Sequence, residues 1–263
     1  MKKRSDLFDL SGKVCVVIGA GLIGSECALR CGTHGATVIV ADTDKKKAAG
    51  VAGTIIKAGG NAAPYVVDSL SDVSVKTLAA AVAKHFKRVD ALVNTTYPRT
   101  AQWGKHFEDL SYEEFSKHVA THTGAQFLTT RAFAKLMKKQ KAGSIVLIGS
   151  IYGTHAPRFE MYEGSDINPP AIEYAIAKGG LAMMTKYLAK YYGQSGIRVN
   201  MLSPGGVADK QSKSFARKYG AHATLGNRML APSDLSGTLV YLFSEASRDV
   251  TGQNIIVDGG WTL

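Results

Sequence analysis

Short apolar runs that are rich in β-branched residues alternate with longer helical patterns along the whole chain. Runs such as the one from Val14 to Ile18 are apolar at every position, which is typical of strands that are covered on both faces. Strict alternation of strands and helices predicts a parallel sheet with right-handed crossovers. We therefore expect one doubly wound α/β domain of the Rossmann type over residues 1–263, with about seven strands and helices on both faces of the sheet.

The bounds of the expected elements follow from periodicity and β-branched content. Strands are predicted at Val14–Ile18, Thr37–Ala41, Ala62–Val67, Ala91–Asn94, Ser144–Ile148, Arg198–Leu202 and Asn254–Val257. Helices are predicted at Leu22–His34, Lys45–Lys57, Val73–Phe86, Tyr112–Lys139, Ile172–Tyr192 and Ser233–Glu245. Ligands of such sheets bind beyond the carboxyl ends of the strands, which is where the sequence places Asp42, Asp68, Asn94, Ser150 and Pro204.

A glycine-rich sequence joins the first predicted strand to the first predicted helix. It reads Gly19-Ala-Gly21-Leu22-Ile23-Gly24, and we expect these residues to bind a dinucleotide. Glycines permit a tight turn and let backbone N–H groups approach a pyrophosphate, whose charge the helix N-terminus favours. The same spacing occurs in ordinary turns, but a position between a buried strand and a helix favours the dinucleotide interpretation.

Asp42 ends the second predicted strand, where an acidic side chain can accept hydrogen bonds from the adenosine ribose hydroxyls of NAD. Its charge also repels the 2′-phosphate of NADP, because like charges about 4 Å apart cost roughly 1 kcal/mol in water and about 4 kcal/mol at an effective dielectric constant of about 20. Lys45, Lys46 and Lys47 follow closely and could weaken this discrimination. We expect the cofactor to be NAD in preference to NADP.

Tyr174 and Lys178 lie on one face of a predicted helix, about one turn apart. A phenol with a pKa of about 10 is a poor proton carrier at neutral pH, and an ammonium group beside it favours the phenolate. Ser150 ends an apolar run upstream, and its hydroxyl can hydrogen-bond a carbonyl or alkoxide oxygen. These three residues predict a catalytic site that moves a proton on and off a carbinol oxygen.

The charge of the chain bears on its partners. There are 32 Lys and Arg residues against 21 Asp and Glu residues, which gives a net charge of +11. The basic residues are dispersed, and several lie near predicted helix C-termini, so a solvated surface is one explanation and attraction of an anionic substrate is the other. No nucleic-acid motif accompanies the charge, and no apolar run approaches the roughly 18 residues of a membrane span.

The cysteines and the N-terminus bear on the compartment. Cys15, Cys27 and Cys31 show no spacing typical of a metal site, so no metal is expected. Cys27 and Cys31 share one face of a predicted helix, which buried thiols explain better than part of a metal site. The basic N-terminus has no apolar stretch behind it, as a signal peptide would have. A reduced, cytoplasmic protein is the expectation.

With these residues in this order, the sequence resembles the short-chain dehydrogenases/reductases along nearly its whole length, through the ending from Thr251 to Trp261. The resemblance implies Tyr174 as the catalytic acid/base, Lys178 as the group that lowers its pKa and holds the nicotinamide ribose, and Ser150 as the group that polarises the substrate. Further implied cofactor residues are Asp68 near the adenine, Asn94 at the end of the fourth strand, and Pro204, Gly205 and Val207 by the nicotinamide. Family members are commonly homotetramers or dimers paired through the helices expected at 112–139 and 172–192.

Several positions depart from the family's usual sequence. The glycine-rich loop is one residue shorter, and Asn94 is followed by Thr-Thr-Tyr97 in place of Asn-Ala-Gly. The helix asparagine that often completes the proton relay aligns with Thr121, which precedes His122, and a threonine expected after Pro-Gly aligns with Asp209. Thr121 or His122 could take part in the relay, or both could be neutral helix residues. These departures bear on turnover more than on the fold.

The interval between Ser150 and Tyr174 is longer than the family's usual one and contains an insertion at about 157–170. Tyr162 lies nearer the ordinary spacing, but position 166 is aspartate, so Tyr162 lacks the lysine partner that Tyr174 has. The segment is similar to that of the branch named for flagellin modification, which is assigned to bacterial glycan synthesis, including nonulosonic sugars. We expect Arg158 and Tyr162 to bind substrate, although an oligomer contact or an unselective surface lid would also explain the segment.

Three functions remain open at this point. The first is an NAD(P)-dependent oxidoreductase that acts on the carbinol or ketone of a sugar or sugar phosphate, a small-molecule substrate that is anionic or polyhydroxylated. The second is a 3-oxoacyl-thioester reductase, against which Asp42 argues because biosynthetic reductases usually use NADPH. The third is a nucleotide-binding protein with little catalysis, suggested by Tyr97, Thr121 and Asp209.

Overall fold

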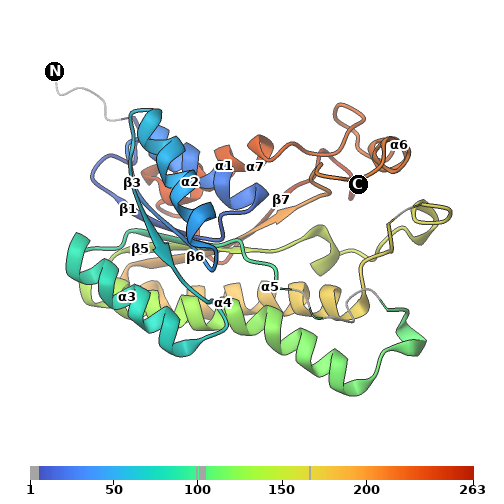
Figure 1. The fold of residues 1–263 in the computed structure, drawn as a ribbon, viewed down its shortest axis with the longest axis horizontal. Coiled ribbons are helices and arrows are strands. Elements are labelled where there is room, and N and C mark those ends of the chain that lie inside the picture. Colours follow the sequence, from blue (N-terminus) through green and yellow to red (C-terminus); the bar gives the residue numbers. More distant parts are fainter. Residues whose placement is uncertain (1–5, 99, 101–104, 166) are drawn as a thin grey trace.

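A computed structural model describes residues 6–98, 100, 105–165 and 167–263 of the chain. Within these residues all strands form one seven-stranded sheet in the order β3-β2-β1-β4-β5-β6-β7 (Figure 1). Every neighbouring pair is parallel. The strands are β1 (Val14–Ile18), β2 (Thr37–Asp42), β3 (Asn61–Val66), β4 (Ala91–Asn94), β5 (Gly143–Ile148), β6 (Ile197–Pro204) and β7 (Asn254–Val257). The strand order reverses direction between β1 and β4, which is the switch point where such sheets bind ligands.

Helices cover both faces of the sheet (Figure 1). They are α1 (Leu22–Thr33), α2 (Lys45–Lys57), α3 (Asp72–Phe86), α4 (Tyr112–Gln140), α5 (Ile172–Tyr192), α6 (Lys213–Gly220) and α7 (Ser233–Phe243). Buried residues of α1, α2 and α7 form one core with the sheet, and those of α3, α4 and α5 form a second core on the opposite face. The predicted doubly wound α/β fold is therefore confirmed.

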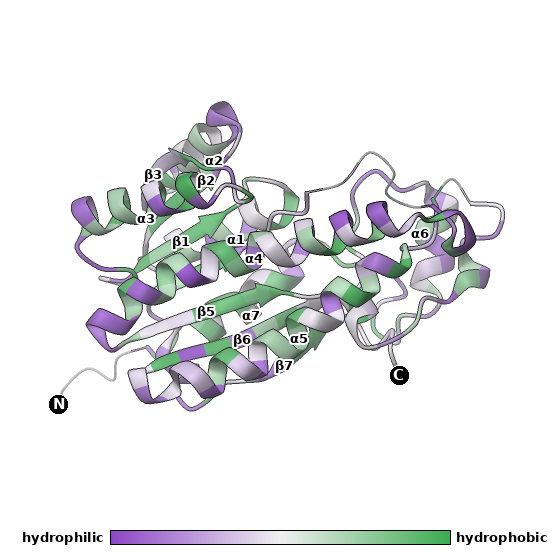
Figure 2. Cartoon of the chain, turned by 90° about the horizontal axis from the view of Figure 1, so that it is seen from below, coloured by the Kyte–Doolittle hydropathy of each residue, from purple (hydrophilic) through white to green (hydrophobic). Residues whose placement is uncertain are grey.

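Strand β1 shows why a run of uniformly apolar residues is needed. Its side chains alternate between the two faces, so Cys15 and Val17 belong to one core while Val16 and Ile18 belong to the other. Figure 2 shows the same arrangement for the molecule, with hydrophobic residues along the central strands and hydrophilic residues on the outer faces of the helices. Edge strand β3 is less buried and accommodates Pro64, which a central strand would not tolerate.

The structure differs from the sequence-based expectation by one or two residues at the ends of several elements, and by one further helix. Strand β3 begins and ends one residue earlier than predicted, at Asn61 and Val66. Helix α6 was not predicted, because eight residues with several charges and few apolar positions give a weak helical signal. In the structure it begins after Ser212, whose hydroxyl accepts a hydrogen bond of 3.2 Å from the N–H of Phe215. Phe215 then packs into a small core near the carboxyl ends of the strands.

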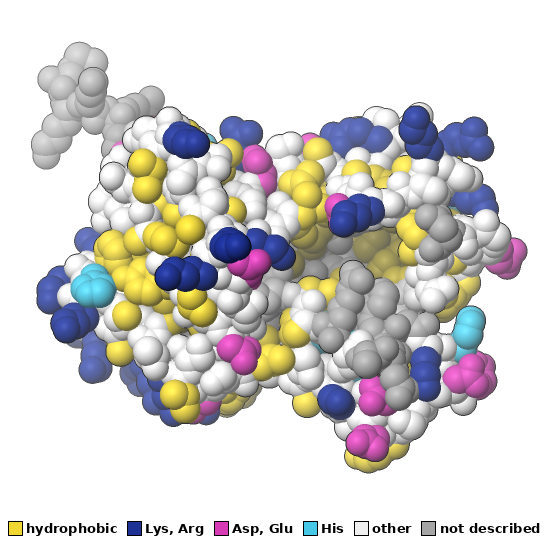
Figure 3. All heavy atoms as spheres, in the orientation of Figure 1, with side chains coloured by type: hydrophobic (Ala, Val, Ile, Leu, Met, Phe, Trp, Pro, Cys, Tyr) yellow, Lys and Arg dark blue, Asp and Glu magenta, His cyan; other side chains and the backbone are white. Residues whose placement is uncertain are grey.

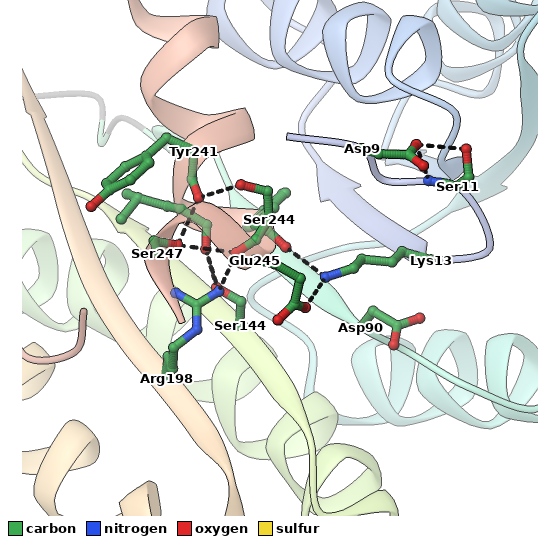
Figure 4. A network of polar contacts seen from close by, with 12 residues as sticks. Asp9, Ser11, Lys13, Asp90, Ser144, Arg198, Tyr241, Ser244, Glu245 and Ser247 are labelled. Atoms are coloured by element: carbon green, nitrogen blue, oxygen red, sulfur yellow. Dashed lines mark hydrogen bonds and ion pairs between the residues drawn. The ribbon is translucent and has the colours of Figure 1, made fainter. Parts of the chain in front are cut away.

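A polar network holds the C-terminal end of α7 against the amino ends of the strands (Figure 4). The Ser144 hydroxyl and the Arg198 guanidinium both donate to the carbonyl of Leu242, at 2.7 and 2.8 Å. Lys13 donates to the carbonyl of Phe243 at 3.3 Å and pairs with Glu245 at 2.8 Å. Cations near the last carbonyls of a helix complement its dipole. This network fixes the amino edge of the sheet and leaves the carboxyl edge for ligands.

Candidate active site

A cavity of about 910 Å³ lies at the carboxyl ends of the central strands. Figure 3 shows the molecular surface hollowed near its centre, with hydrophobic side chains inside the hollow. Most of the predicted site residues line this cavity, namely Gly19, Gly21, Leu22, Ile23, Gly24, Asp42, Asp68, Ser150, Tyr174, Lys178, Pro204, Gly205 and Val207. The glycine-rich loop and the Ser150, Tyr174 and Lys178 side chains, which are distant in sequence, therefore border one space.

The glycine-rich loop is packed too closely for side chains at two of its positions. Gly19 adopts φ +98°, a backbone conformation that favours glycine, and a Cβ there would lie 2.6 Å from the Thr95 hydroxyl. A Cβ on Gly24 would overlap the carbonyl of Gly19. A Cβ on Gly21 would meet nothing within 4 Å, so there is free space beside Gly21 in the cavity. The loop is thus held against β4 by contacts that only glycine permits.

Helix α1 differs at its N-terminus from the three helices that follow it. Asp44, Ser71 and Ser111 cap α2, α3 and α4 by accepting hydrogen bonds from backbone N–H groups of the first turn. Gly21 at the N-terminus of α1 provides no side-chain cap, and the first turn of α1 carries no acidic residue. The first turn of α1 therefore presents backbone donors and the positive end of the helix dipole to the cavity, which suits an anionic group such as a pyrophosphate.

Asp42 connects the end of β2 to the glycine-rich loop. One carboxylate oxygen accepts a hydrogen bond of 2.7 Å from the N–H of Ala20, and the other accepts one of 2.9 Å from the N–H of Asp44. The oxygen bound by Asp44 also accepts from the Thr43 hydroxyl at 3.3 Å, so the oxygen bound by Ala20 is the one that keeps a lone pair for a ligand hydroxyl. Asp44 in turn accepts from the N–H groups of Lys46 and Lys47, so the N-terminus of α2 is already occupied by a carboxylate.

Lys178 is a buried cation at the other end of the cavity, with only 6% of its surface exposed. Its ammonium group donates a hydrogen bond of 2.7 Å to the carbonyl of Ile148 and lies 5.5 Å from the centre of the Tyr174 ring. Burial lowers the pKa of Lys178 to about 8, because removal from water disfavours its charged form. The lysine is therefore mostly charged at neutral pH, with its ammonium group beside the Tyr174 ring.

Ser150 is positioned by the short 3₁₀ turn η2 (Ile151–Gly153) that follows β5. Its hydroxyl accepts a hydrogen bond of 3.1 Å from the N–H of Tyr152. A Cβ on Gly153 would lie 2.8 Å from the backbone of Lys178, so the absence of a side chain lets this turn pack directly on α5. This contact packs the turn after Ser150 onto the helix that carries Tyr174 and Lys178, and all three residues line the same cavity.

Asn94 lies behind the cavity wall rather than in it. Its amide donates to the carbonyl of Ala125 and to the hydroxyl of Thr129, both at 3.2 Å. Its side-chain oxygen accepts hydrogen bonds from the N–H and the hydroxyl of Thr96. Asn94 thus joins β4 to α4 and shapes the backbone from which Thr95, Thr96, Tyr97 and Pro98 line the cavity.

Of the two residues considered for the missing relay asparagine, His122 is the one that packs against the site. Its ring lies 4.4 Å from the ring of Tyr97 and 6.3 Å from that of Tyr174, measured between centroids. Thr121, the residue aligned from the sequence, is only half-buried. Asp209 is exposed, and its backbone N–H donates to the side chain of Gln211.

The segment 157–170 is packed against a small aromatic core beside the cavity. The Arg158 guanidinium lies 5.1 Å from the centre of the Trp261 ring, and the hydroxyls of Tyr162 and Tyr152 are 2.8 Å apart. Met161 is buried in this core. Arg158 and Tyr162 are not among the residues that line the cavity, whereas Tyr152 and Pro170 are. Asp166 lies outside the described residues.

Sequence reasoning did not identify several residues that line the cavity. They are Thr43, Ser69, Leu70, Thr95, Thr96, Pro98, Ile148, Gly149, Ile151, Tyr152, Pro170 and Gly206. Nearly all of them lie within a few residues of a predicted strand end or a predicted site residue, which was the available signal. Tyr97 was noted in the sequence only as a departure from the family pattern.

Comparison with known proteins identifies the family. A family model described as enoyl-(acyl carrier protein) reductase matches residues 19–262. The chain is 36% identical over 198 residues to post-translational flagellin modification protein A of Campylobacter coli, covering 75% of this chain and 77% of that protein. It is 30% identical to 3-oxoacyl-(acyl-carrier-protein) reductase FabG of Thermotoga maritima, over 97% of this chain and 99% of that protein. The structure of a short-chain dehydrogenase/reductase from Mycobacterium marinum superposes with a TM-score of 0.86 at 30% identity, covering 98% of each chain.

The chain belongs to the short-chain dehydrogenase/reductase family. Proteins of this family are NAD(P)-dependent oxidoreductases that act on alcohol and ketone groups, and this chain is one of them. The predicted family membership and enzyme class are thereby confirmed. Among the described residues, no helix is both long and apolar enough to cross a membrane.

Proposed function

We propose that the protein transfers a hydride between NAD and the carbinol or ketone of a sugar or sugar phosphate, with Tyr174 as the acid/base. The observation that carries this proposal is the shared cavity, which has the glycine-rich loop and Asp42 in one part of its wall and Ser150, Tyr174 and Lys178 in another. A dinucleotide needs this arrangement, because its pyrophosphate and its nicotinamide must reach two separate sets of residues.

The residues present fit a nicotinamide dinucleotide. The uncapped N-terminus of α1 and the close-packed glycines suit the pyrophosphate, and Asp42 suits the adenosine ribose hydroxyls. Lys178 would hold the nicotinamide ribose, and Pro204, Gly205 and Val207 would border the nicotinamide. When bound, the nicotinamide supplies the hydride acceptor or donor.

The protein's own side chains manage the proton. In the oxidation direction, the Tyr174 phenolate takes the proton from the carbinol oxygen while the Ser150 hydroxyl donates a hydrogen bond to that oxygen. Lys178 stabilises the phenolate electrostatically from within a buried site, where charges interact more strongly than in water. In the reduction direction, the Tyr174 hydroxyl returns the proton to the oxygen.

NAD is proposed in preference to NADP because two carboxylates occupy the region where a 2′-phosphate would bind. Asp42 lines the cavity, and Asp44 occupies the first-turn N–H groups of α2, which would otherwise suit a phosphate. Lys45, Lys46 and Lys47 lie just beyond these two residues. The discrimination expected from the charge of Asp42 is about tenfold or more.

The sugar substrate is supported by the relative named for flagellin modification and by the net charge of +11, which attracts anions. The role would then lie in the synthesis of bacterial surface glycans of the nonulosonic-acid type. The relative from Thermotoga maritima supports the alternative, a 3-oxoacyl-thioester reductase. A panel of galactitol, glucose, a sugar phosphate and acetoacetyl-coenzyme A distinguishes the two, because each proposal expects kcat/KM to be highest for its own class.

The test of the proposed chemistry is Tyr174→Phe. The variant should bind NADH with unchanged affinity and lose nearly all turnover of whichever panel member is active, because it removes the acid/base and little else. Retention of most of the activity would show that Tyr174 is not the acid/base. Normal NADH binding by the unmodified protein with no turnover across the panel would favour a nucleotide-binding protein with little catalysis.

We also propose a homo-oligomer, a tetramer or a dimer, paired through α4 and α5. Large apolar side chains on these two helices are exposed, with Met183, Tyr187 and Tyr191 each more than 60% accessible and Phe127 49% accessible. Burial of such a patch against a second copy would explain it. A cytoplasmic location is proposed because Cys15, Cys27 and Cys31 are buried free thiols.

A further inference from the structure

Two histidines of α4 form a direct pair beside the proposed acid/base. His118 and His122 are one helical turn apart, and their Nε2 atoms are 2.7 Å apart. Both rings are buried, with 1% and 5% of their surfaces exposed. A nitrogen–nitrogen contact of this length is a hydrogen bond, so one Nε2 carries the shared proton and the other accepts it.

The pair is connected at both ends. On the cavity side, the His122 ring packs on Tyr97 at 4.4 Å and lies 6.3 Å from Tyr174, and the rings of Tyr97 and Tyr174 are 5.3 Å apart. On the outer side, Nδ1 of His118 is 2.8 Å from the hydroxyl of Thr100, a half-buried residue. The pair thus lies between the Tyr97 and Tyr174 rings at the cavity and a half-buried threonine on the outer side.

The surroundings keep the pair able to exchange a proton. Burial lowers the pKa of His118, while the charges of Glu173 and Glu114 oppose this effect. A neutral imidazole has one donor and one acceptor nitrogen, which a relay requires. Glu173 is almost fully buried, and its Oε2 has no hydrogen-bond partner among the described residues. The titratable groups around the pair are Glu114 from its own helix, Glu173 and Tyr174 from α5, and Tyr97 from the loop after β4.

We propose that His122 and His118 relay protons between Tyr174 and solvent. In the oxidation direction, Tyr174 receives a proton from the carbinol and must release it before the next turnover. A water molecule carries that proton from the phenol to Nδ1 of His122, and His122 passes its Nε2 proton to Nε2 of His118. His118 releases its Nδ1 proton to the Thr100 hydroxyl, which gives its own proton to water. One proton enters and one leaves, and the two imidazoles end in the opposite tautomers.

A metal site is not an alternative explanation for the pair. Among the residues that the structure describes, no group of three or more His, Cys, Asp and Glu side chains could hold a metal ion. The remaining alternative is a structural role, in which the pair only fills the space between α4 and α5. The two roles differ in their response to buffer. A proton relay can be replaced by proton acceptors in solution, whereas a packing role cannot.

The test is His118→Gln, because the glutamine amide can still hydrogen-bond His122 but cannot pass a proton on. The probe is the best-used alcohol of the substrate panel with NAD. We expect kcat to fall roughly tenfold or more, with NADH affinity unchanged, and to recover as imidazole buffer is added. The pH profile of kcat should also change. The relay would be overturned if kcat and its pH profile were the same in the variant as in the unmodified protein and kcat did not respond to added imidazole.

A second variant keeps the test decisive if His118→Gln folds poorly. Thr100→Val removes the outer hydroxyl at nearly constant volume from a half-buried position, and the relay predicts the same buffer-dependent loss of kcat. Ring-nitrogen NMR of the unmodified protein adds a measurement without turnover: the two Nε2 atoms should share one proton and titrate as a pair, whereas independent titration would overturn the proposal.

This inference rests on Tyr174 being the acid/base, and the two can fail separately. Activity of Tyr174→Phe would refute the proposed function. An inactive Tyr174→Phe together with fully active His118→Gln and Thr100→Val would refute the relay alone.

Discussion

The two halves of the cavity are built by different means. The half that we propose to bind the cofactor (the cofactor half), formed by the ends of β1, β2 and β4, relies on backbone geometry. It has close-packed glycines, an uncapped helix N-terminus and one carboxylate that binds backbone N–H groups. The substrate half, beyond the end of β5, relies on side chains, with Tyr152, Tyr162 and Trp261 packed around a segment that contains only short helical turns.

The difference shows how each half can change. Backbone donors recognise a ligand that stays the same, so substitutions that displace this backbone should act in an all-or-none way on cofactor binding. A layer of aromatic side chains can be altered residue by residue, so substitutions in the substrate half should have graded effects on substrate and small effects on cofactor. Four variants test this contrast, from the largest expected effect to the smallest.

Gly24→Ala should have the largest effect. Its Cβ would overlap the Gly19 carbonyl, which is loop backbone and cannot move without opening the loop, and would also press on the Thr95 hydroxyl. We expect NADH affinity to fall more than about a thousandfold, equivalent to about 4 kcal/mol, as measured by fluorescence titration. Gly50→Ala is the matched control, because a Cβ at this helical position meets nothing within 4 Å. Binding of Gly24→Ala within tenfold of the unmodified protein would contradict the all-or-none behaviour of this half.

The sequence predicted which residues line this half of the cavity because the signals for them are local. A strand, a glycine-rich turn and a helix follow one another directly, and Asp42 ends the next strand. The order of these elements also sufficed for the doubly wound fold. The structure adds the reason why position 24 must be glycine: a side chain there would collide with Gly19 and Thr95.

The substrate half could not be predicted in the same way because its contacts join segments that are distant in sequence. The ring of Trp261 meets Tyr152 and Arg158, and the pairing of Tyr152 with Tyr162 depends on a segment without periodicity. Likewise, the orientation of Asn94 towards α4 depends on the packing of Ala125 and Thr129. Such tertiary contacts leave no pattern in the sequence.

Lys178→Met should have the next largest effect, on stability. Burial holds the folded-state pKa of Lys178 at about 8, below its value of about 10.4 in an unfolded chain. Between these values the unfolded state binds more protons, so this lysine makes the protein more stable as the pH rises. From pH 7 to 10.5 the free energy of unfolding should rise about 3 kcal/mol more in the unmodified protein than in the variant.

Urea unfolding across this pH range measures the effect, and the exposed Lys186 of the same helix gives the control variant Lys186→Met. If the difference in the free energy of unfolding between the unmodified protein and Lys178→Met does not change with pH, Lys178 is not held in a desolvated site. Lys178→Met should also be inactive, although it should be more stable than the unmodified protein at neutral pH. That combination would identify Lys178 as a functional group at the junction of the two halves.

Asp42→Asn should have an intermediate effect on cofactor choice. The amide oxygen can keep the hydrogen bond from the N–H of Ala20, whereas the hydrogen bond from the N–H of Asp44 is lost together with the charge. The ratio of NADP to NAD dissociation constants should fall about tenfold, equivalent to about 1.4 kcal/mol. Asp68→Asn removes a second carboxylate from the cavity wall and should leave the ratio unchanged. Equal affinities for NAD and NADP in the unmodified protein would show that the lysines at 45–47 dominate.

Tyr162→Phe should have the smallest effect and should be confined to the substrate half. It removes one hydroxyl of the 2.8 Å contact with Tyr152, which lines the cavity, while the ring keeps its packing on Phe215. A lost hydrogen bond of this kind costs about 1 kcal/mol, so KM for the substrate should rise a fewfold with no change in NADH affinity. Tyr112→Phe, at a tyrosine that is 84% exposed, is the control and should change neither constant. A loss of NADH affinity as large as the change in KM would mean that the two halves are coupled through Tyr152, and the contrast drawn between them would not hold.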